Sequence, residues 1–238
     1  MEKKLIYSGK AKNVHQLSKN TVILEFRDDA TAGNKAKHDV IQGKGELNCS
    51  ISSMMFEYLH DNFYSLTHYI DKISSNTQLC YAVDIIPIEV IVRNKSAGTF
   101  CKRYGIEKGK KFEDPIVEFC LKNDDLNDPI ITHDVIIQLD IASFAELASM
   151  KSNALDINDK LITLFKKIKL DLIDFKLEFG LRKKDNVLVL SDEICPDTMR
   201  LWDEQGNSFD KDLFRENTGD LLEGYKRVET LLRNEIGC

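Results

Sequence analysis

The residues from Ile173 to Phe179 alternate strictly between apolar and charged side chains. In an extended strand, successive side chains point to opposite faces, so Asp174, Lys176 and Glu178 share one face. The other face carries Ile173, Phe175, Leu177 and Phe179. Such a strand either lies at the edge of a sheet with one solvated face or holds a functional row of charges. The alternation predicts the strand itself, and the surrounding residues must decide between these two roles.

A second strand is predicted immediately after this one. The polar residues Lys183–Asn186 form a turn, and the apolar run Val187–Leu190 is typical of a buried strand in a β-hairpin. With an odd-length loop of about three or five residues, Glu178 and Asp192 lie directly opposite each other. Two facing carboxylates repel unless a divalent cation neutralises them, and oxygen-only ligation favours magnesium or manganese over zinc. The hairpin therefore predicts a metal site at Glu178 and Asp192.

The composition limits the classes of protein that fit the chain. With 238 residues and 42% apolar content, it can bury a large core as one domain or as two lobes that share a cleft. No apolar run reaches the length of a membrane span, and Met1–Tyr7 lacks the apolar stretch of a signal peptide, so we expect a soluble, cytoplasmic protein. A net charge of −6 argues against nucleic-acid binding but allows a local basic pocket. The six cysteines show neither zinc-site nor disulfide-scaffold spacing.

The apolar spacing predicts strands first and long helices later. Short strands are expected at Lys4–Tyr7, His15–Leu17 and Thr21–Arg27. A helix is expected at Glu46–Asn62, and a strand pair over residues 81–93 is expected to break at a hinge at Pro87. A second, longer amphipathic helix spans residues 143–170, with the polar stretch Asp156–Asp159 as a candidate interruption.

Any phosphate-binding site must differ from the common glycine-rich loops. The chain has neither a Walker-type loop nor a G-x-G-x-x-G motif that follows a strand. Between two predicted strands, Gly9 permits close backbone approach, and Lys10 and Lys12 point to one face if the segment is extended. These lysines either lie in solvent on an edge strand or neutralise the phosphates of a nucleotide.

Several segments carry a family resemblance. Asp174–Gly180 and Asp192–Asp203 resemble the two C-terminal signatures of the SAICAR synthetase family, the phosphoribosylaminoimidazole-succinocarboxamide synthases of purine biosynthesis. Further segments are similar to the family in order along almost the whole chain, namely Tyr7–Lys12, Phe26–Ala32, Gly43–Gly45, Ile86–Asn94 with Ser96–Thr99, and Lys122–Pro129. Departures from the family pattern, such as Ser8 and His15, remove no group that the family's chemistry requires.

The resemblance implies an α+β fold of two lobes, related to ATP-grasp and kinase-like enzymes, with the active site in the cleft between them. A β-rich N-terminal lobe, residues 1–86, would bind the nucleotide. A larger α+β C-terminal lobe, residues 87–238, would hold the metal and substrate sites. The implied partners are ATP, the imidazole-carboxylate ribonucleotide CAIR and L-aspartate, with Mg²⁺ as the metal and a second copy of the chain in a homodimer. Neither a nucleic acid nor a membrane is implied.

The resemblance also implies roles for individual residues. ATP binding is implied for Gly9, Lys10, Ala11, Lys12, Ile85, Ile86, Glu89 and Lys122. Substrate binding is implied for Arg93, Ser96, Thr99, Asp197, Thr198 and Arg200. Lys176 and Asp174 are the implied catalytic residues, and Glu178 and Asp192 the implied metal ligands. Arginine suits the CAIR phosphate because its planar fork grips phosphoryl oxygens, and the turn Ser96–Thr99 predicts a short helix that offers backbone amides.

The implied reaction is an ATP-dependent ligation. ATP phosphorylates the CAIR carboxylate, the amino group of L-aspartate attacks the acyl phosphate, and SAICAR, ADP and phosphate result. Lys176 would steady the carboxylate, while Asp174, Asp197 and Thr198 would orient CAIR or aspartate. Two alternatives stay open: a phosphotransferase that acts on a hydroxyl, and a nucleotide-binding module without catalysis. The chain lacks the kinase catalytic-loop and Asp-Phe-Gly motifs, and the second alternative does not explain its full set of charged motif residues.

Overall fold

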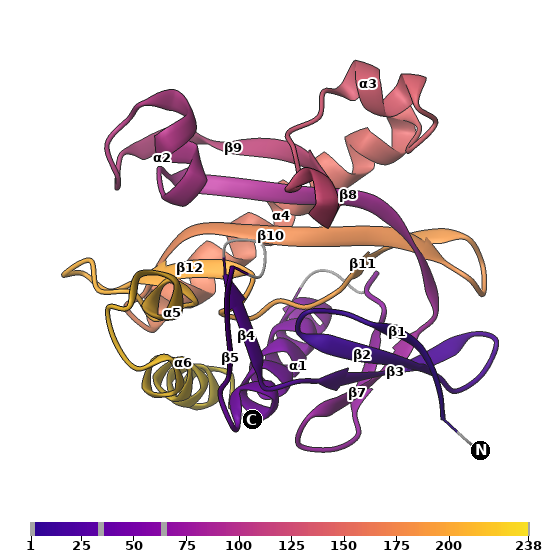
Figure 1. Cartoon of the computed structure of the whole chain (residues 1–238), viewed down its shortest axis with the longest axis horizontal. Coiled ribbons are helices and arrows are strands. Elements are labelled where there is room, and N and C mark those ends of the chain that lie inside the picture. Colours follow the sequence, from indigo (N-terminus) through magenta and orange to yellow (C-terminus); the bar gives the residue numbers. More distant parts are fainter. Residues whose placement is uncertain (1–2, 33–35, 63–65, 238) are drawn as a thin grey trace.

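The computed structural model describes residues 3–32, 36–62 and 66–237 as an α+β fold with two large sheets (Figure 1). The first sheet is antiparallel and comprises, in spatial order, β1 (Lys4–Ser8), β2 (Lys12–Gln16), β3 (Thr21–Phe26), β7 (Thr77–Tyr81) and β6 (Tyr69–Lys72). Helix α1 (Lys44–Asn62) packs on this sheet, with Cys49 in one apolar cluster with Val22 and Cys80. The predicted strands are confirmed, except that the second runs from Lys12 to Gln16, because its pairing with β3 spans these residues.

The second sheet positions most of the charged motifs. Its strands are, in spatial order, β11 (Val187–Ser191), β10 (Asp171–Arg182), β8 (Val83–Lys95) and β9 (Lys111–Leu121), with β12 (Met199–Trp202) also paired to β10. Strand β10 is therefore central, with β8 on one side and β11 and β12 on the other. Helix α4 (Phe144–Lys167) packs against β10, β8 and β9. The edge-strand interpretation of β10 is wrong because both of its edges are paired.

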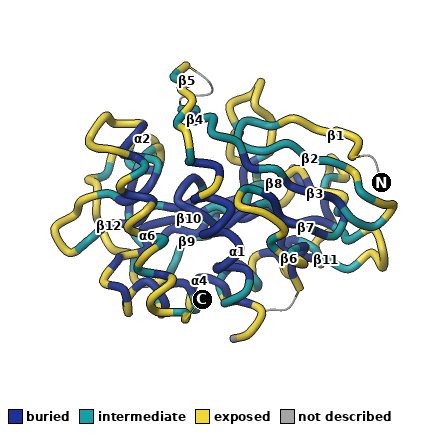
Figure 2. Tube along the Cα trace, turned by 90° about the horizontal axis from the view of Figure 1, so that it is seen from below, coloured by how far each residue is buried: buried dark blue, intermediate teal, exposed yellow. Residues whose placement is uncertain are grey.

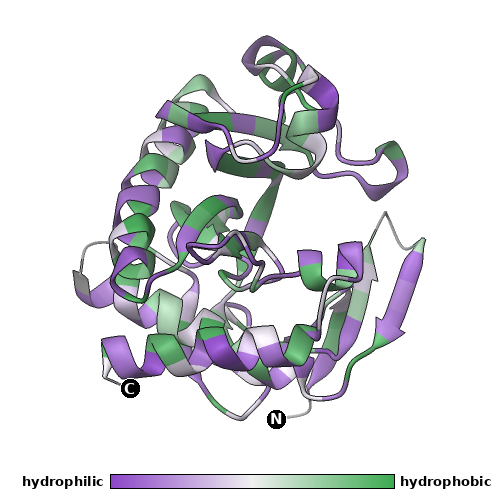
Figure 3. Cartoon of the chain, turned by 90° about the vertical axis from the view of Figure 1, so that its left-hand side faces the viewer, coloured by the Kyte–Doolittle hydropathy of each residue, from purple (hydrophilic) through white to green (hydrophobic). Residues whose placement is uncertain are grey.

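Shorter elements complete the fold. They are the hairpin of β4 (Asp29–Ala32) and β5 (Lys37–Val40), the helices α2 (Gly98–Tyr104), α3 (His133–Gln138), α5 (Asp212–Glu216) and α6 (Leu221–Ile236), and the 3-10 turn Asp124–Leu126. Helix α6 packs against α1 through an apolar face that includes Leu221, Tyr225 and Val228. Figure 3 shows hydrophobic and hydrophilic residues alternating along the helical ribbons, as expected for helices with one buried face. No helix within the described residues is long and apolar enough to cross a membrane.

The core follows the apolar faces of β10 and the helices, and the tube is dark blue along β10 and α1 (Figure 2). Phe175, Leu177 and Phe179 of β10 belong to the main core cluster. The alternation predicted that Ile173 would share this environment, but Ile173 lies outside the main core cluster. It packs instead with Trp202, because the pairing of β10 with β12 shifts register between Leu172 and Asp174.

Two expected interruptions differ from the structure. Strand β8 runs through Pro87 without ending, although its ladder with β10 is irregular nearby. The Pro87 carbonyl accepts a hydrogen bond from Lys122 N at 3.0 Å. Helix α4 runs unbroken through Asp156–Asp159, because Ile157 and Asn158 are fully buried against the sheet side of the helix and stabilise it through tertiary contacts.

Candidate functional site

A cavity of about 640 Å³ brings most of the predicted site residues together. The β1–β2 turn, β4, β8, β10, α5 and the loop after β11 all contribute to its walls. The predicted residues that line it are Gly9, Lys10, Ala11, Lys12, Glu89, Arg93, Thr99, Lys122, Asp174, Lys176, Glu178, Asp192, Asp197, Thr198 and Arg200. A second cavity, of about 860 Å³ and lined by residues such as Tyr58 and Glu235, contains none of them.

Three predicted residues lie outside the cavity lining. Ile85 is exposed, and Ile86 belongs to the apolar core. Ser96 is fully buried, where its hydroxyl donates to the Glu107 carbonyl at 2.6 Å and accepts from Lys110 N at 2.8 Å. The Ser96 side chain therefore ties down the loop after α2 and does not point into the cavity.

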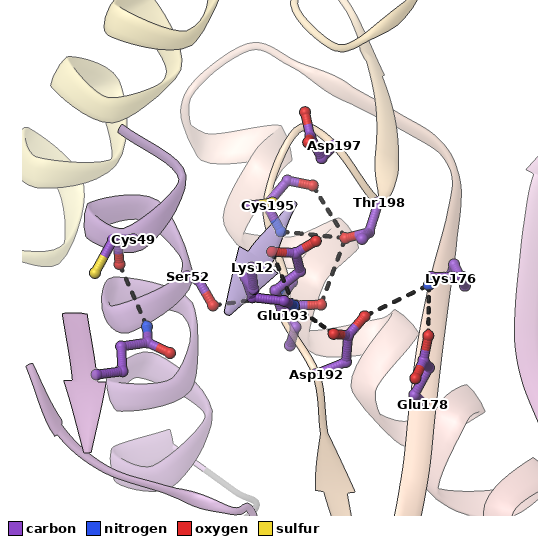
Figure 4. Close-up of polar contacts among 12 residues, drawn as sticks. Lys12, Cys49, Ser52, Lys176, Glu178, Asp192, Glu193, Cys195, Asp197 and Thr198 are labelled. Atoms are coloured by element: carbon purple, nitrogen blue, oxygen red, sulfur yellow. Dashed lines mark hydrogen bonds and ion pairs between the residues drawn. The ribbon is translucent and has the colours of Figure 1, made fainter. Parts of the chain in front are cut away.

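The two predicted metal ligands meet at Lys176. The Lys176 Nζ lies 2.6 Å from Glu178 Oε1 and 3.4 Å from Asp192 Oδ2 (Figure 4). The predicted pairing is nevertheless wrong, because the hairpin loop has four residues and Glu178 pairs with Ser191. Asp192 lies one residue beyond this pair, with its backbone in the left-handed region at a φ of 64°, and it shares the Lys176 ammonium with Glu178.

Electrostatics keeps both groups of this cluster charged. Burial raises the pKa of the Asp192 carboxyl, but Lys12, Lys176 and Lys122 outweigh burial and hold the pKa well below its usual range. Burial lowers the pKa of the Lys176 ammonium, but Glu178, Asp192 and Glu89 outweigh it and raise that pKa well above its ordinary value. Asp192 and Lys176 are thus both held in their charged forms.

Glu178 and Asp192 fit a magnesium site. Both offer carboxylate oxygens that converge on one position, which the Lys176 ammonium now neutralises. No group of three or more acidic, histidine or cysteine side chains that could hold a metal occurs in the described ranges. Magnesium in nucleotide sites requires only one or two carboxylates, since phosphates and water supply the remaining ligands.

Lysines from two other segments reach the same cluster. Lys12 pairs with Asp192 and Lys122 pairs with Glu178, while Lys10 lies 2.6 Å from Asp124. Lys10 and Lys12 thus contact different partners. Only 11% of the Lys12 side chain is exposed, which rules out a solvated role for this residue.

Two arginines form the opposite end of the cavity. Asp174 accepts hydrogen bonds from Arg93 Nη1 at 2.9 Å and from Arg200 Nη1 at 2.8 Å. Each arginine has a second carboxylate partner, Glu118 at 2.6 Å for Arg93 and Asp212 at 2.7 Å for Arg200. These contacts hold both guanidinium groups in fixed orientations while part of each remains at the cavity wall.

The arginine end depends on a glycine in the predicted turn. Helix α2 begins at Gly98, which confirms the short helix expected after Ser96. Gly98 has a φ of 54°, and a Cβ at this position would collide with the Arg200 guanidinium. A glycine therefore suits both the left-handed backbone conformation and the close approach of Arg200.

Several charged residues in or near the cavity were not predicted as site residues, among them Lys44, Glu193, Lys211 and Arg215. Lys44 is fully buried and pairs with Asp197 Oδ2 at 2.6 Å, and Tyr225 donates to Asp197 Oδ1 at 2.6 Å. Burial raises the pKa of Asp197, but Lys211 and Lys44 outweigh it and lower that pKa below its usual range. Lys211 and Arg215 line the cavity, as does Glu193. The signal for Lys44 and Glu193 was their place in the segments Gly43–Gly45 and Asp192–Asp203, whereas Lys211 and Arg215 carried no distinct pattern.

The fold and the site together define an enzyme class. A cavity with an arginine end for an anion and a lysine–carboxylate end suited to nucleotide and metal is typical of enzymes that use ATP on a phosphorylated substrate. The SAICAR synthetase family model matches residues 5–232. The phosphoribosylaminoimidazole-succinocarboxamide synthase of Staphylococcus saprophyticus is 49% identical over 224 residues, which are 93% of this chain and 95% of the relative. That of Methanocaldococcus jannaschii is 48% identical over 96% of this chain and 94% of the relative.

Solved structures agree with these sequence matches. The Ehrlichia chaffeensis phosphoribosylaminoimidazole-succinocarboxamide synthase has a TM-score of 0.93 at 42% identity, covering 96% of this chain and 98% of that one. A SAICAR synthetase in complex with ADP has a TM-score of 0.92 at 40% identity, covering 96% and 97%. The chain therefore belongs to the SAICAR synthetase family, and its activity is that of an ATP-dependent ligase in purine biosynthesis.

Proposed function

We propose that this chain joins L-aspartate to the carboxylate of CAIR through an acyl phosphate, with ATP converted to ADP and phosphate. One observation carries the proposal. Asp174 and Lys176 are neighbours on the same face of β10, with Asp174 between two arginines and Lys176 between two carboxylates. A substrate with a phosphate at one end and a carboxylate at the other matches this arrangement.

The arginine end is the proposed site of the CAIR phosphate. Arg93 and Arg200 would bind the phosphoryl oxygens, together with the hydroxyl of Thr99. Asp174 would keep both guanidinium groups in place. Ser96 would contribute indirectly, because its hydroxyl holds the loop that follows α2.

The lysine–carboxylate end is the proposed site of ATP. Lys10, Lys12 and Lys122 would neutralise its phosphates, with Gly9 and Ala11 allowing close approach of the backbone, and the related SAICAR synthetase that binds ADP supports this assignment. The backbone at Ile85 and Ile86, and Glu89 next to Lys176, would contact the remainder of the nucleotide.

Glu178 and Asp192 are the proposed holders of Mg²⁺. When bound, the ion would neutralise charge on the phosphates during transfer. Lys176, which now occupies the space between these carboxylates, would then turn to the CAIR carboxylate and hold it for phosphorylation. Thr198 and Asp197 would orient the substrates from the adjoining loop.

The proposed reaction has two steps. A CAIR carboxylate oxygen attacks the terminal phosphorus of ATP, and ADP leaves. The neutral amino group of L-aspartate then attacks the acyl carbon, a C–N bond forms, and the C–O bond to phosphate breaks as the amine loses a proton. Positioning and charge neutralisation suffice for both steps, so no covalent enzyme intermediate is required.

The division of the chain into two lobes is also part of the proposal. Residues 1–86 and 87–238 would form two lobes around the cavity, and the change from one sheet to the other falls close to this boundary, between β7 and β8. The homodimer and the cytoplasmic location stay predictions.

The decisive experiment measures ADP release and SAICAR formation with ATP, Mg²⁺ and CAIR, with and without L-aspartate. We expect turnover and SAICAR only when all three substrates are present. ADP release that is equally fast without L-aspartate would favour a phosphotransferase. ATP binding without turnover would favour a non-catalytic module.

A further inference from the structure

A pair of amide side chains lies between α4 and the second sheet, behind the arginine end. Asn158 of α4 is fully buried among the apolar residues of that helix. Asn94 Nδ2 donates to Asn158 Oδ1 at 2.8 Å, and Asn158 Nδ2 donates to Asn94 Oδ1 at 3.1 Å. Two apolar side chains would fill this space without the cost of removing amide groups from water. Core packing alone therefore does not explain the pair.

Asn94 also holds the neighbouring strand. Its Nδ2 donates a second hydrogen bond, at 3.1 Å, to the Leu172 carbonyl of β10. On β8, Val90 and Val92 belong to the main core cluster, and Asn94 is the next residue on that face. Arg93 lies on the opposite face, at the cavity wall. The amide pair thus joins α4, β8 and β10 behind Arg93.

Strand β10 changes faces at the carbonyl that Asn94 holds. Leu172 and Phe175 both belong to the main core cluster, although residues three apart in a regular strand point to opposite faces. The register of β10 with β12 shifts between Leu172 and Asp174, which makes Ile173 the extra residue of a bulge. Without this bulge, Asp174 would share the core face of Leu172, because residues two apart share a face. The bulge therefore turns Asp174 toward the cavity.

The bulge decides the geometry of the arginine end. Because Asp174 faces the cavity, its carboxylate lies between Arg93 and Arg200, which donate to it at 2.9 and 2.8 Å. The pairing of β8 with β9 also shifts its register at Asn94, between Arg93 and Lys95. Irregularities on two strands thus coincide where the amide pair holds them. Bulges beside active sites re-aim side chains in this way.

We infer that Asn158 is a positioning residue for the arginine end and acts through Asn94. By holding the Leu172 carbonyl, the amide pair fixes the bulge that sets Asp174 between the two arginines. Two amides satisfy each other in only one relative placement of helix and strands, whereas apolar side chains tolerate sliding. The inference rests on the proposed function, since the ligand of this end is the proposed CAIR phosphate. Asn158 itself is not part of the cavity lining.

Steady-state kinetics test this positioning role. Asn158→Leu replaces the amide by an apolar side chain of similar size and should raise the KM for CAIR about tenfold, the effect expected when one hydrogen bond is lost. The KM for ATP should stay within about twofold of the wild-type value. Asn153→Leu, at a half-buried position of the same helix, is the matched control and should change neither KM.

A second pair of variants separates positioning from stability. Met150 is fully buried on α4, about two turns before Asn158, so Met150→Ala should lower the Tm but leave the KM for CAIR within about twofold. The double variant Asn94→Leu/Asn158→Leu leaves neither amide of the pair unsatisfied. It should have a higher Tm than Asn158→Leu and still show the raised KM for CAIR. If Asn158→Leu does not fold, the double variant decides the question.

A binding measurement tests the arginine end without turnover. Ribose 5-phosphate carries the phosphate end of CAIR and lacks its carboxylate. Calorimetric titration should give a Kd for ribose 5-phosphate about tenfold higher in Asn158→Leu than in wild type, while the Kd for ADP stays unchanged.

The outcomes distinguish this inference from the proposed function. Wild-type protein that forms no SAICAR contradicts the proposed function, and the titration with ribose 5-phosphate then decides the positioning role. SAICAR formation with an unchanged KM for CAIR in folded Asn158→Leu overturns only the positioning role. An equal rise of the KM values for ATP and CAIR in Asn158→Leu, or a rise for CAIR in Met150→Ala, would indicate a general loss of structure and also overturn the inference.

Discussion

The two ends of the cavity are both rich in charge but are organised differently. At the arginine end, Arg93 and Arg200 are each held by two carboxylates that accept hydrogen bonds from specific guanidinium nitrogens. At the lysine–carboxylate end, Lys176 lies among three carboxylates at distances of 2.6, 3.2 and 3.4 Å. A planar guanidinium loses little freedom when it binds a phosphate, whereas an ammonium on a flexible chain can leave its partners. The first end is preorganised, and the second must rearrange when ligands bind.

The largest expected effect tests the lysine–carboxylate end. Glu178→Gln should lower kcat about a thousandfold, because it removes the charge proposed to bind the metal and leaves Lys176 and Lys122 without their shared partner. Single-turnover and steady-state rates of SAICAR formation measure the loss. Glu204→Gln, in an exposed turn, is the control. A loss of less than tenfold for Glu178→Gln would show that this carboxylate takes no part in the reaction.

The next effect tests the preorganisation of the arginine end. Arg200→Lys keeps the positive charge but removes the fork, so the KM for CAIR should rise about a hundredfold while the KM for ATP changes little. Arg227→Lys on α6, where the arginine stacks over Phe209, is the control. An equal rise for ATP and CAIR would contradict a dedicated role of Arg200 at the arginine end.

A smaller effect tests the backbone that supports Arg200. Gly98→Ala should displace the Arg200 guanidinium and raise the KM for CAIR about tenfold, and the left-handed backbone should lower the free energy of unfolding by about 1–2 kcal/mol. Gly206→Ala is a matched control, since Gly206 has a φ of 84° and open space around it. It should show the stability loss without the change in KM. Identical kinetics for the two variants would contradict a role of Gly98 in positioning Arg200.

The smallest effect concerns His68, a buried residue behind Asp192. Burial lowers the pKa of His68 to about 4, and its ring packs against Phe56. The unfolded chain takes up this proton near pH 6.5. Stability should therefore fall as the pH decreases from about 6.5 to about 4, by roughly 3 kcal/mol at most, and should show no contribution from His68 above that window. Urea unfolding of wild type and His68→Asn across this range should give a shallower pH slope for the variant. An equal dependence of stability on pH in wild type and His68→Asn would contradict the lowered pKa of His68.

Local patterns predicted the elements well and their pairing less well. The alternation from Ile173 to Phe179 predicted β10, and apolar spacing predicted α1 and α4. The pairing of Glu178 depended on a loop length that the polar turn does not specify, and a loop of four residues rather than three or five moved its partner to Ser191. The break expected in α4 failed because buried contacts of Ile157 outweigh weak local helix propensity.

For the site, too, local patterns predicted some features and missed others. Motifs predicted a site that contains Lys12, Asp174, Lys176, Glu178, Asp192 and Arg200, and the structure brings these residues into one cavity. Lys211 and Arg215 escaped prediction because charged residues in a short helix of five residues, or directly before it, resemble any solvated surface. Only the folded chain shows that both side chains line the cavity.

The sequence by itself determined the family, the strand with its charged face and the kinds of chemical groups available to the reaction. These follow from short-range spacing and from motifs, which local geometry translates directly into faces and turns. Only the tertiary structure decided which charges neutralise each other. The ion pairs Lys44–Asp197 and Lys12–Asp192 each join residues more than 150 positions apart in the chain. Whether a charged group is neutralised depends on its burial and on its ion-pair partners, and local sequence patterns do not reveal partners at such separations.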